Sequence, residues 1–454
     1  MKKCNKIMKI MTIFFVFTSL VSYAQTTLTI EEVFTIALEK NIDIKIKKNE
    51  REIAKNSSSL GQAKLFPSIN IIAGAGVNEG ESNIDFATNE FPSVNSTESE
   101  SSSLNAGIEI KYNLFNGLSS FYTYKKLNKE NDIKSIELQI QIEQILIKSA
   151  KYYYDISFLQ RQLEINQKII DISLERYKKV VERNKYGSSS KLDLLSAEID
   201  LNNDSTKYIN VKFELNQSKQ SLKKLLNSNN FLDFKVENIS LNKKVINFET
   251  LMEKAKLNNQ NILLQKCITE VMEADKKIVS SNYLPKISLM ANYGYNLNKS
   301  NTSLISNQND IGLGAVINFY WNIFDGFTKS KMLKNAKIQI ESNKLLLEKI
   351  ELEIYSELKQ TFDQYISNIN ISNLEKRNKK SAENFFTRAK EQYKQGIMSN
   401  NDFRKAQMEV EQSQNKLNQS MYLTKLAELN LYRISGSILY LSLIHISEPT
   451  RRTP

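Results

Sequence analysis

The chain is poor in the residues on which most catalytic and metal chemistry depends. Its 454 residues include two cysteines and one histidine. Cys4 lies in an N-terminal segment expected to be removed, so Cys267 has no intrachain partner and a disulfide in the mature chain is excluded. The sole histidine, His445, lies in a C-terminal tail of doubtful origin, which excludes Ser-His-Asp catalysis, Cys-His catalysis and histidine metal sites. We expect no enzyme, no cofactor and no metal site.

Long hydrophobic runs are also missing. After residue 24, no stretch holds the roughly 18 apolar residues that a transmembrane helix requires, so any membrane crossing must be made by strands. Residues 1–24 have the features of a signal peptide: a lysine-rich start, an apolar run over 11–20 and the cleavage signal Ser22-Tyr23-Ala24. The residue directly after that site is Gln25 and not the cysteine of a lipoprotein signal, so no lipid anchor is expected.

Positive charge is not concentrated at one place. The formal net charge is +12, and lysines and glutamates are interspersed along the chain. A nucleic-acid binder should gather its positive charge into a patch. We therefore expect no nucleic-acid partner.

The chain contains an internal duplication. Ala37, Asn41 and Pro67 recur 218 positions later as Ala255, Asn259 and Pro285. Further on the offset is 209, and it relates Asn116-Gly117 to Asp325-Gly326, Gly187 to Gly396, and Asp193 to Asp402. The offset changes within a Ser/Asn/Glu-rich stretch at 78–103, as an exposed loop tolerates. We expect two structural repeats, 25–227 and 249–437, separated by an irregular equatorial segment at 228–248.

Each repeat contains a pair of segments in which apolar and polar residues alternate, within 67–115 and 285–324. Ile72, Met290 and Val316 are the main exceptions. Runs of about 11 residues suit tilted strands that cross hydrocarbon, and this alternation is typical of membrane barrels. The alternative is two amphipathic hairpins packed on a soluble core, because alternation alone does not distinguish lipid from a protein interior.

Four strands cannot close a barrel, and an open edge in lipid leaves backbone groups unsatisfied. Subunits must therefore contribute strands jointly. Two chains would give eight strands and a barrel filled by its own side chains. Three would give twelve strands around an open lumen, which fits better because the polar faces carry mostly Gly, Ser and Asn.

Two long segments, 117–186 and 326–395, contain no proline and no internal glycine. As helices they would each reach roughly 105 Å. Apolar residues recur in sevens in the first, as side-by-side helix packing requires. Return helices are expected over 191–227 and 401–436, and pre-strand helices over 29–65 and 249–283. A simple coiled-coil rod is an alternative, but it leaves the strands unexplained.

The signal peptide, duplication and strand pairs, each opening after a proline, together resemble the TolC-type outer-membrane efflux protein family over about residues 27–437. The resemblance implies an α+β membrane protein of the outer membrane that extends into the periplasm. Three subunits would build a β-barrel of twelve strands, four from each, on a coiled-coil barrel of twelve helices. The implied partners are two sister copies, outer-membrane lipid, a periplasmic adaptor (membrane fusion) protein and an inner-membrane pump of RND, ABC or MFS type.

The turns after the two long helices share a Gly-x5-Asp spacing, from Gly187 to Asp193 and from Gly396 to Asp402. Glycine can end a helix and serine can cap the next one, so hairpin geometry explains part of the motif. In the family these tips dock on the adaptor. The implied docking residues are Tyr186, Gly187, Ser188, Ser189, Ser190 and Leu195, with Gly396, Ile397, Met398, Ser399 and Phe403 in the second repeat.

The resemblance also implies a periplasmic gate. Asp193, Tyr393 and Asp402 match positions whose polar links close the channel in the family. A linking arginine of the family corresponds here to Met398, however, and a second pore acid to Lys405. The closing network must therefore differ, and we do not expect a cation-selective acidic constriction.

We expect a passive export conduit for small molecules. The alternatives are the outer-membrane component of type I protein secretion, a periplasmic adaptor or structural coiled coil, and an envelope hydrolase, for which no catalytic carboxylate pair stands out. An adaptor would carry one helical hairpin rather than two. Residues 441–454 do not continue the duplication, and we expect 438–454 to be a non-native tail.

Overall fold

The computed structural model describes residues 26–84, 94–228, 234–241, 246–302 and 305–438. The expected signal peptide and all but the first residue of the expected tail lie outside the described residues. The chain divides into two compact units. A helical unit comprises Met1–Ile46, Ile140–Asn259 and Leu352–Pro454, and a strand unit comprises Lys47–Gln139 and Gln260–Glu351.

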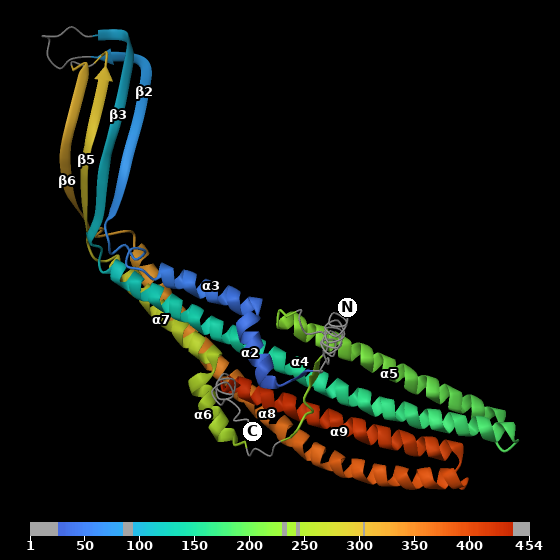
Figure 1. The fold of residues 1–454 in the computed structure, drawn as a ribbon. Coiled ribbons are helices and arrows are strands. Elements are labelled where there is room, and N and C mark those ends of the chain that lie inside the picture. Colours follow the sequence, from blue (N-terminus) through green and yellow to red (C-terminus); the bar gives the residue numbers. More distant parts are fainter. Residues whose placement is uncertain (1–25, 85–93, 229–233, 242–245, 303–304, 439–454) are drawn as a thin grey trace, which may run out of the picture. The chain divides into compact units, whose positions relative to one another are not determined.

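The strand unit contains one antiparallel sheet in the order β2-β3-β5-β6 (Figure 1). Its strands are β2 (Ser68–Ile84), β3 (Val94–Phe115), β5 (Lys286–Ser300) and β6 (Asn307–Tyr320). The four predicted strands are therefore present, although at 14 to 22 residues they are longer than the expected 11. The central pairing of β3 with β5 joins the two repeats, with Gly107 opposite Gly294.

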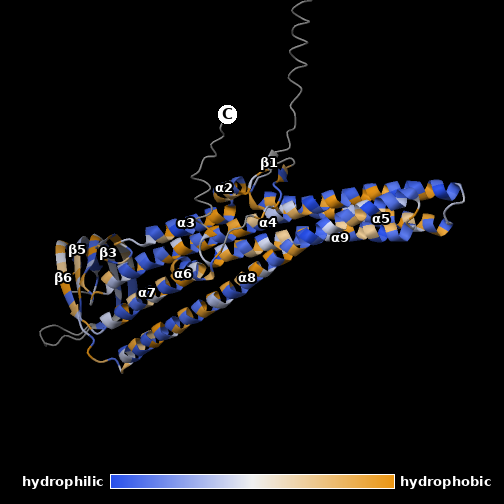
Figure 2. Cartoon of the chain, turned by 90° about the horizontal axis from the view of Figure 1, so that it is seen from below, coloured by the Kyte–Doolittle hydropathy of each residue, from blue (hydrophilic) through white to orange (hydrophobic). Residues whose placement is uncertain are grey.

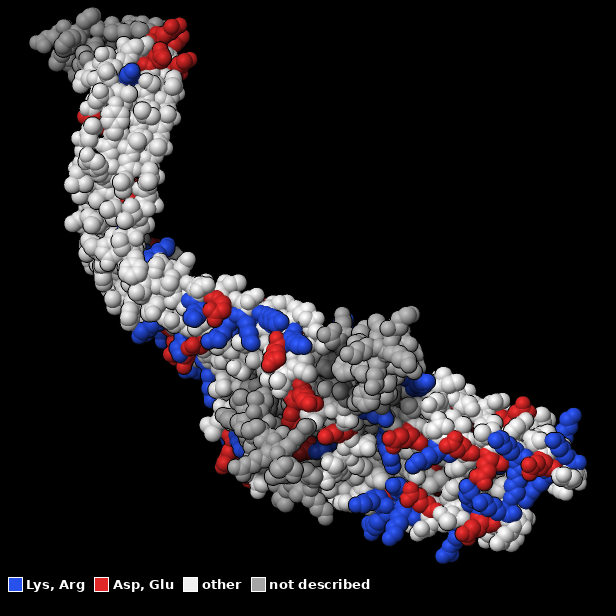
Figure 3. Space-filling model, viewed as in Figure 1, with Lys and Arg blue, Asp and Glu red and all other residues white. Residues whose placement is uncertain are grey.

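The sheet presents apolar side chains to solvent in a single chain. Ile71, Leu313 and Ile317 are among its exposed large residues. Charged side chains gather over the helices, whereas the visible face of the sheet carries few of them (Figure 3). An exposed apolar surface of this kind marks a surface that contacts lipid or protein.

The predicted long helices are present as α4 (Ser119–Lys185) and α8 (Thr328–Gln395), and the return helices as α5 (Lys191–Leu225) and α9 (Asn400–Ile434). Apolar and polar residues are mixed along their length (Figure 2). None of the described helices is both long and apolar enough to cross a membrane. Each strand-to-helix corner places a glycine and the next residue, Gly117-Leu118 and Gly326-Phe327, at φ of +66° to +68°. The corners predicted from these glycines are thus confirmed.

The pre-strand helices differ from the expectation of two continuous helices. Asn41 separates α2 (Ile30–Lys40) from α3 (Ile42–Ser57), and Asn259 separates α6 (Phe248–Asn258) from α7 (Gln260–Ser281). Both asparagines have extended backbones, with ψ of 131° and 120°, so the regular helical hydrogen bonding stops there. The cause is a tertiary contact that sequence periodicity does not reveal.

The helical unit also contains a small parallel sheet of β1 (Thr26–Leu28) and β4 (Phe234–Val236). It was not predicted, because three-residue strands are too short to show a period. It places part of the expected equatorial segment beside the beginning of the first repeat. Tyr153 of α4 fixes this junction, since its hydroxyl donates to the Leu28 carbonyl and accepts from the Glu237 amide.

Candidate functional site at the helical hairpin tips

Both hairpin tips turn through a left-handed glycine. Gly187 has φ of +71° and Gly396 has φ of +80°. Just past each glycine, a backbone amide closes the last helical turn. Ser188 donates to the Arg183 carbonyl at 2.8 Å, and Ile397 donates to the Gln392 carbonyl at 3.0 Å. The glycines therefore end α4 and α8 in the way that the motif predicted.

The two tip aspartates cap the helices that follow. The Ser190 hydroxyl accepts from the Asp193 amide at 3.1 Å and donates to the Asp193 carboxylate at 2.7 Å. Ser399 and Asp402 repeat this arrangement at 3.1 and 2.7 Å. These serine hydrogen bonds lower the pKa of both carboxyls. Within the described part of one chain, neither carboxylate forms a hydrogen bond or ion pair with the other hairpin.

Tyr393 is the one predicted gate residue that joins the two hairpins. Its ring stacks on Phe403 with centroids 4.3 Å apart and planes 8° apart. From the first hairpin, the Lys179 ammonium lies 4.8 Å from the ring centroid and donates to the Tyr393 carbonyl at 3.0 Å. Arg183 lies 5.3 Å from the same centroid. Two cationic side chains of α4 therefore lie close to the Tyr393 ring.

The predicted docking residues separate into exposed and buried groups. Tyr186 is 85% exposed and Ile397 and Leu195 are also exposed. Phe403 is only 3% exposed, because it packs with Ala389, Tyr393 and Ala406 in the core of the second hairpin, and Met398 packs against that cluster. Phe403 therefore has to be removed from the set of surface residues.

A buried charge network, not predicted from the sequence, lies farther from the tips. Arg404 of α9 donates two hydrogen bonds to the Asp204 carboxylate of α5, at 2.7 and 2.9 Å. Asp204 also accepts from the Ser173 hydroxyl of α4 at 2.5 Å. Arg176 of α4 donates to Asp200 of α5 at 2.5 Å. We call Arg176, Asp200, Asp204 and Arg404 the inter-hairpin cluster.

The cluster is electrically neutral and largely shielded from water. Arg176 and Asp204 are each 1% exposed. Burial would raise the pKa of Asp204, but its hydrogen bonds from Arg404 and Ser173 hold the pKa below its usual value. A buried charge that loses its partner is strongly destabilising. The cluster therefore ties the first hairpin to α9 of the second.

Two further ion pairs join the same hairpins. Lys390 of α8 lies 2.9 Å from Glu175 of α4, and Lys207 of α5 lies 2.9 Å from Glu411 of α9. The first pair is at the surface and contributes little, whereas Glu411 in the second is buried. In the described ranges, no group of His, Cys, Asp and Glu residues is arranged to hold a metal ion.

Comparisons with known proteins agree with this architecture. A sequence model described as "Outer membrane efflux protein" matches residues 33–228 and 251–437. The outer membrane protein TolC of Vibrio cholerae serotype O1 is 22% identical over 317 residues, which cover 67% of each chain.

Solved structures show the same fold at low sequence identity. A membrane protein from Pseudomonas aeruginosa has a TM-score of 0.75 with 15% identity over 91% of both chains. The Campylobacter jejuni CmeC outer membrane channel has a TM-score of 0.75 with 16% identity, over 90% of this chain and 85% of that one. Because the family match covers both repeats, the chain belongs to the outer membrane efflux protein family, which confirms its expected location in the outer membrane.

Proposed function

We propose that the protein is one subunit of a homotrimeric, passive channel that carries small molecules out of the periplasm. The observation that carries this proposal is a four-stranded sheet whose edge strands, β2 and β6, pair with no further strand among the described residues. Lipid does not tolerate such edges. Three copies would join them into twelve strands around a lumen lined mainly by Gly, Asn and Ser.

The helices support the same assembly. On α5, Ile199, Ile209 and Phe213 are exposed in a single chain. On α8, Leu374 and Phe385 are exposed as well. Neighbouring copies would cover these apolar side chains, so that α4, α5, α8 and α9 of three chains form a wall of twelve helices. Such a conduit needs no active site.

The tips fit a role in docking. Tyr186 and Ile397 expose large apolar side chains at the ends of otherwise charged hairpins. A periplasmic adaptor that covers these residues would connect the channel to an inner-membrane pump, which supplies the energy. Asp193 and Asp402 would support docking indirectly, by fixing the shape of each turn.

We further propose that the inter-hairpin cluster, together with Tyr393 and its two cations, holds the channel closed. Moving α9 away from α4 and α5 would expose the cluster to water and separate Arg404 from Asp204. The proposed gate therefore includes residues farther from the tips than the predicted ones. Of the three gate residues implied by the family resemblance, it includes only Tyr393.

Single-channel conductance in planar bilayers tests the channel proposal. The purified protein should insert as a trimer and give discrete conductance steps. A matched pair of variants sharpens the test: Leu313→Asp on the apolar face should abolish insertion, whereas Asn292→Asp on the polar face should insert and shift ion selectivity toward cations. A soluble monomer without conductance would overturn the proposal.

A further inference from the structure

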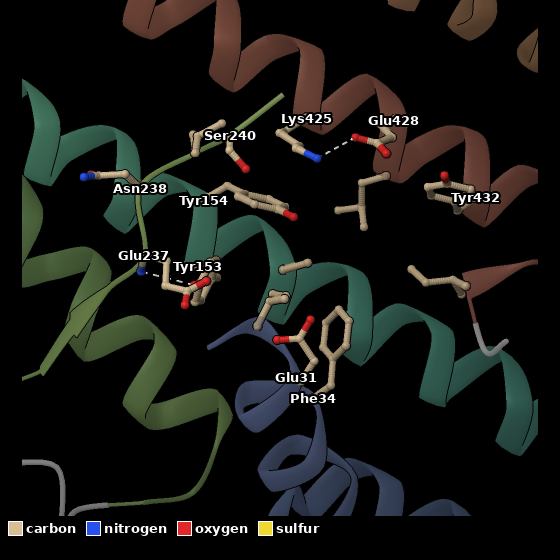
Figure 4. Close-up of a pocket in the computed structure, with 15 residues that line it drawn as sticks. Glu31, Phe34, Tyr153, Tyr154, Glu237, Asn238, Ser240, Lys425, Glu428 and Tyr432 are labelled. Carbon is tan, nitrogen blue, oxygen red and sulfur yellow. Dashed lines mark hydrogen bonds and ion pairs between the residues drawn. The ribbon is translucent and has the colours of Figure 1, made fainter. Parts of the chain in front are cut away.

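A cavity of about 350 Å³ lies in the helical unit where four segments meet (Figure 4). Helix α2 supplies Glu31 and Phe34, α4 supplies Tyr153 and Tyr154, and α9 supplies Glu428. The segment after β4 supplies the remaining wall around Glu237. Cavities of this volume are large enough for small organic ligands.

The charged groups of the cavity do not balance. Lys425 pairs with Glu428 at 2.8 Å, and both side chains are mostly buried, at 16% and 15% exposed. Among the described residues, no cation pairs with the carboxylate of Glu31 or Glu237. Glu31 is half-buried, whereas Glu237 is exposed. Because Lys425 and Glu428 neutralise each other, Glu31 supplies the net negative charge of the cavity wall.

Tyr154 is placed between two of these carboxylates. Its hydroxyl points into the cavity (Figure 4) and forms no hydrogen bond with the described part of the chain. Burial raises the pKa of Tyr154, and the nearby charges of Glu428 and Glu31 raise it further. Tyr153 differs, because its hydroxyl is fully used at the β1–β4 junction.

We propose that this cavity binds a small organic cation, with an ammonium group held by Glu31 and the tyrosine rings and an apolar body packed against Phe34. Aromatic faces attract cations. The Glu31 carboxylate supplies the opposite charge that a partly desolvated ammonium group requires. This inference does not depend on the proposed export function.

The position of Glu31 has one ordinary structural explanation, which the experiment has to separate from binding. Glu31 lies in the first turn of α2, where a carboxylate interacts favourably with the helix dipole. If that were its whole role, the aromatic walls would hold a neutral ligand as well as a charged one. Charge selectivity is therefore the decisive property.

Titration of the full-length protein with choline, followed by calorimetry, tests the proposal. Choline carries a trimethylammonium group, and 3,3-dimethyl-1-butanol is a neutral molecule of the same shape. We expect saturable binding of one choline per chain and binding of the neutral molecule at least tenfold weaker. Glu31→Gln should weaken choline binding at least tenfold, because it removes the charge and keeps the side-chain shape.

Glu39→Gln is the matched control, since Glu39 lies on the same helix, is exposed and does not line the cavity. Its choline affinity should equal that of the wild type. If Glu31→Gln fails to assemble, Tyr154→Leu carries the test, because it removes one of the rings proposed to hold the ammonium group, and it should also weaken choline binding. Absence of saturable choline binding, equal binding of the two probes, or an unchanged choline affinity in the assembled variant would each overturn the proposal.

Discussion

The side-chain amide of Asn259 donates a hydrogen bond to the backbone carbonyl of Ile434 at 2.8 Å. Asn41 makes the same bond to the carbonyl of Leu225 at 2.9 Å. The donors are 218 positions apart and the acceptors 209, so the contact obeys both offsets of the duplication. Each asparagine lies at a break between two helices and donates a hydrogen bond to a backbone carbonyl in the last turn of a return helix. The carbonyls of that turn have no backbone N–H partner within their own helix.

Replacing Asn259 by alanine should destabilise the protein by roughly 1–3 kcal/mol, because the Ile434 carbonyl loses a buried donor. Thermal unfolding of the purified protein would show a lowered midpoint. Asn203→Ala is the control, since Asn203 is exposed on α5. Equal midpoints for the two variants would show that the asparagine contact is dispensable.

Replacing Arg404 by methionine should lower the stability of the protein and increase the fraction of time for which the channel is open. Asp204 would remain buried without its main partner, at a cost of about 3–5 kcal/mol. We expect a lower unfolding temperature and a larger open fraction in single-channel recordings. Lys405→Met, at the exposed neighbouring position, should change neither quantity. A destabilised variant whose open fraction equals that of the wild type would assign the cluster to stability alone.

The proposed docking role of the tips can be tested with two variants, one that removes an exposed side chain and one that strains the backbone of the turn. Tyr186→Ala removes an exposed side chain and should leave trimer assembly and stability unchanged while export of a fluorescent dye from cells falls. Gly187→Ala should lower stability by about 1–2 kcal/mol, since φ of +71° strains any residue with a Cβ. Undiminished export in the Tyr186 variant would argue against docking through this residue.

Glu143 should make stability depend on pH. This α4 carboxyl is 8% exposed and one of its oxygens has no hydrogen-bond partner. Burial raises its pKa from 4.5 to about 7, although the charge of Arg433 opposes the shift. The folded state therefore binds more protons between these values, and stability falls as pH rises through that window.

Above pH 7, Glu143→Gln should be more stable than the wild type by up to about 3 kcal/mol, and near pH 4 the difference should vanish. Chemical unfolding at several pH values measures both. Glu198→Gln, at an exposed position on α5, provides the control. A constant difference across the pH range would show that Glu143 does not titrate in this window.

Sequence periodicity was sufficient for the strands and the long helices, because alternation and an uninterrupted helical pattern are local properties. It failed at Asn41 and Asn259, where the break is fixed by a carbonyl far away in the chain. It also missed Arg176 and Arg404, because charged residues on a helix resemble a solvated face until a neighbouring helix covers them. Phe403 was misplaced for the same reason: its neighbours Tyr393 and Ala406 are known only from the packed hairpin.

The β3–β5 pairing gives a register for the contact between subunits in the proposed trimer. By the two offsets of the duplication, Gly107 of β3 corresponds to Val316 of β6, and Gly294 of β5 corresponds to Gly76 of β2. Val316 of one copy should therefore lie opposite Gly76 of the next. In a Cys267→Ser background, the pair Val316→Cys and Gly76→Cys should form disulfide-linked trimers on oxidation, whereas Val316→Cys with Gly80→Cys should not.

If the β3–β5 pairing within a chain and the proposed β6–β2 pairing between chains follow one register, the trimer has an approximate sixfold axis. Each repeat then meets its neighbours through equivalent edges, whether or not a peptide chain connects them. A ring of six separate half-length chains would satisfy the same backbone hydrogen bonds. The covalent fusion of two halves is therefore not needed to close the barrel; it only fixes that each chain carries one copy of each half. What the fusion adds is the freedom for alternate positions around the ring to diverge, as Gly187 and Gly396 already share a turn whose flanking side chains differ.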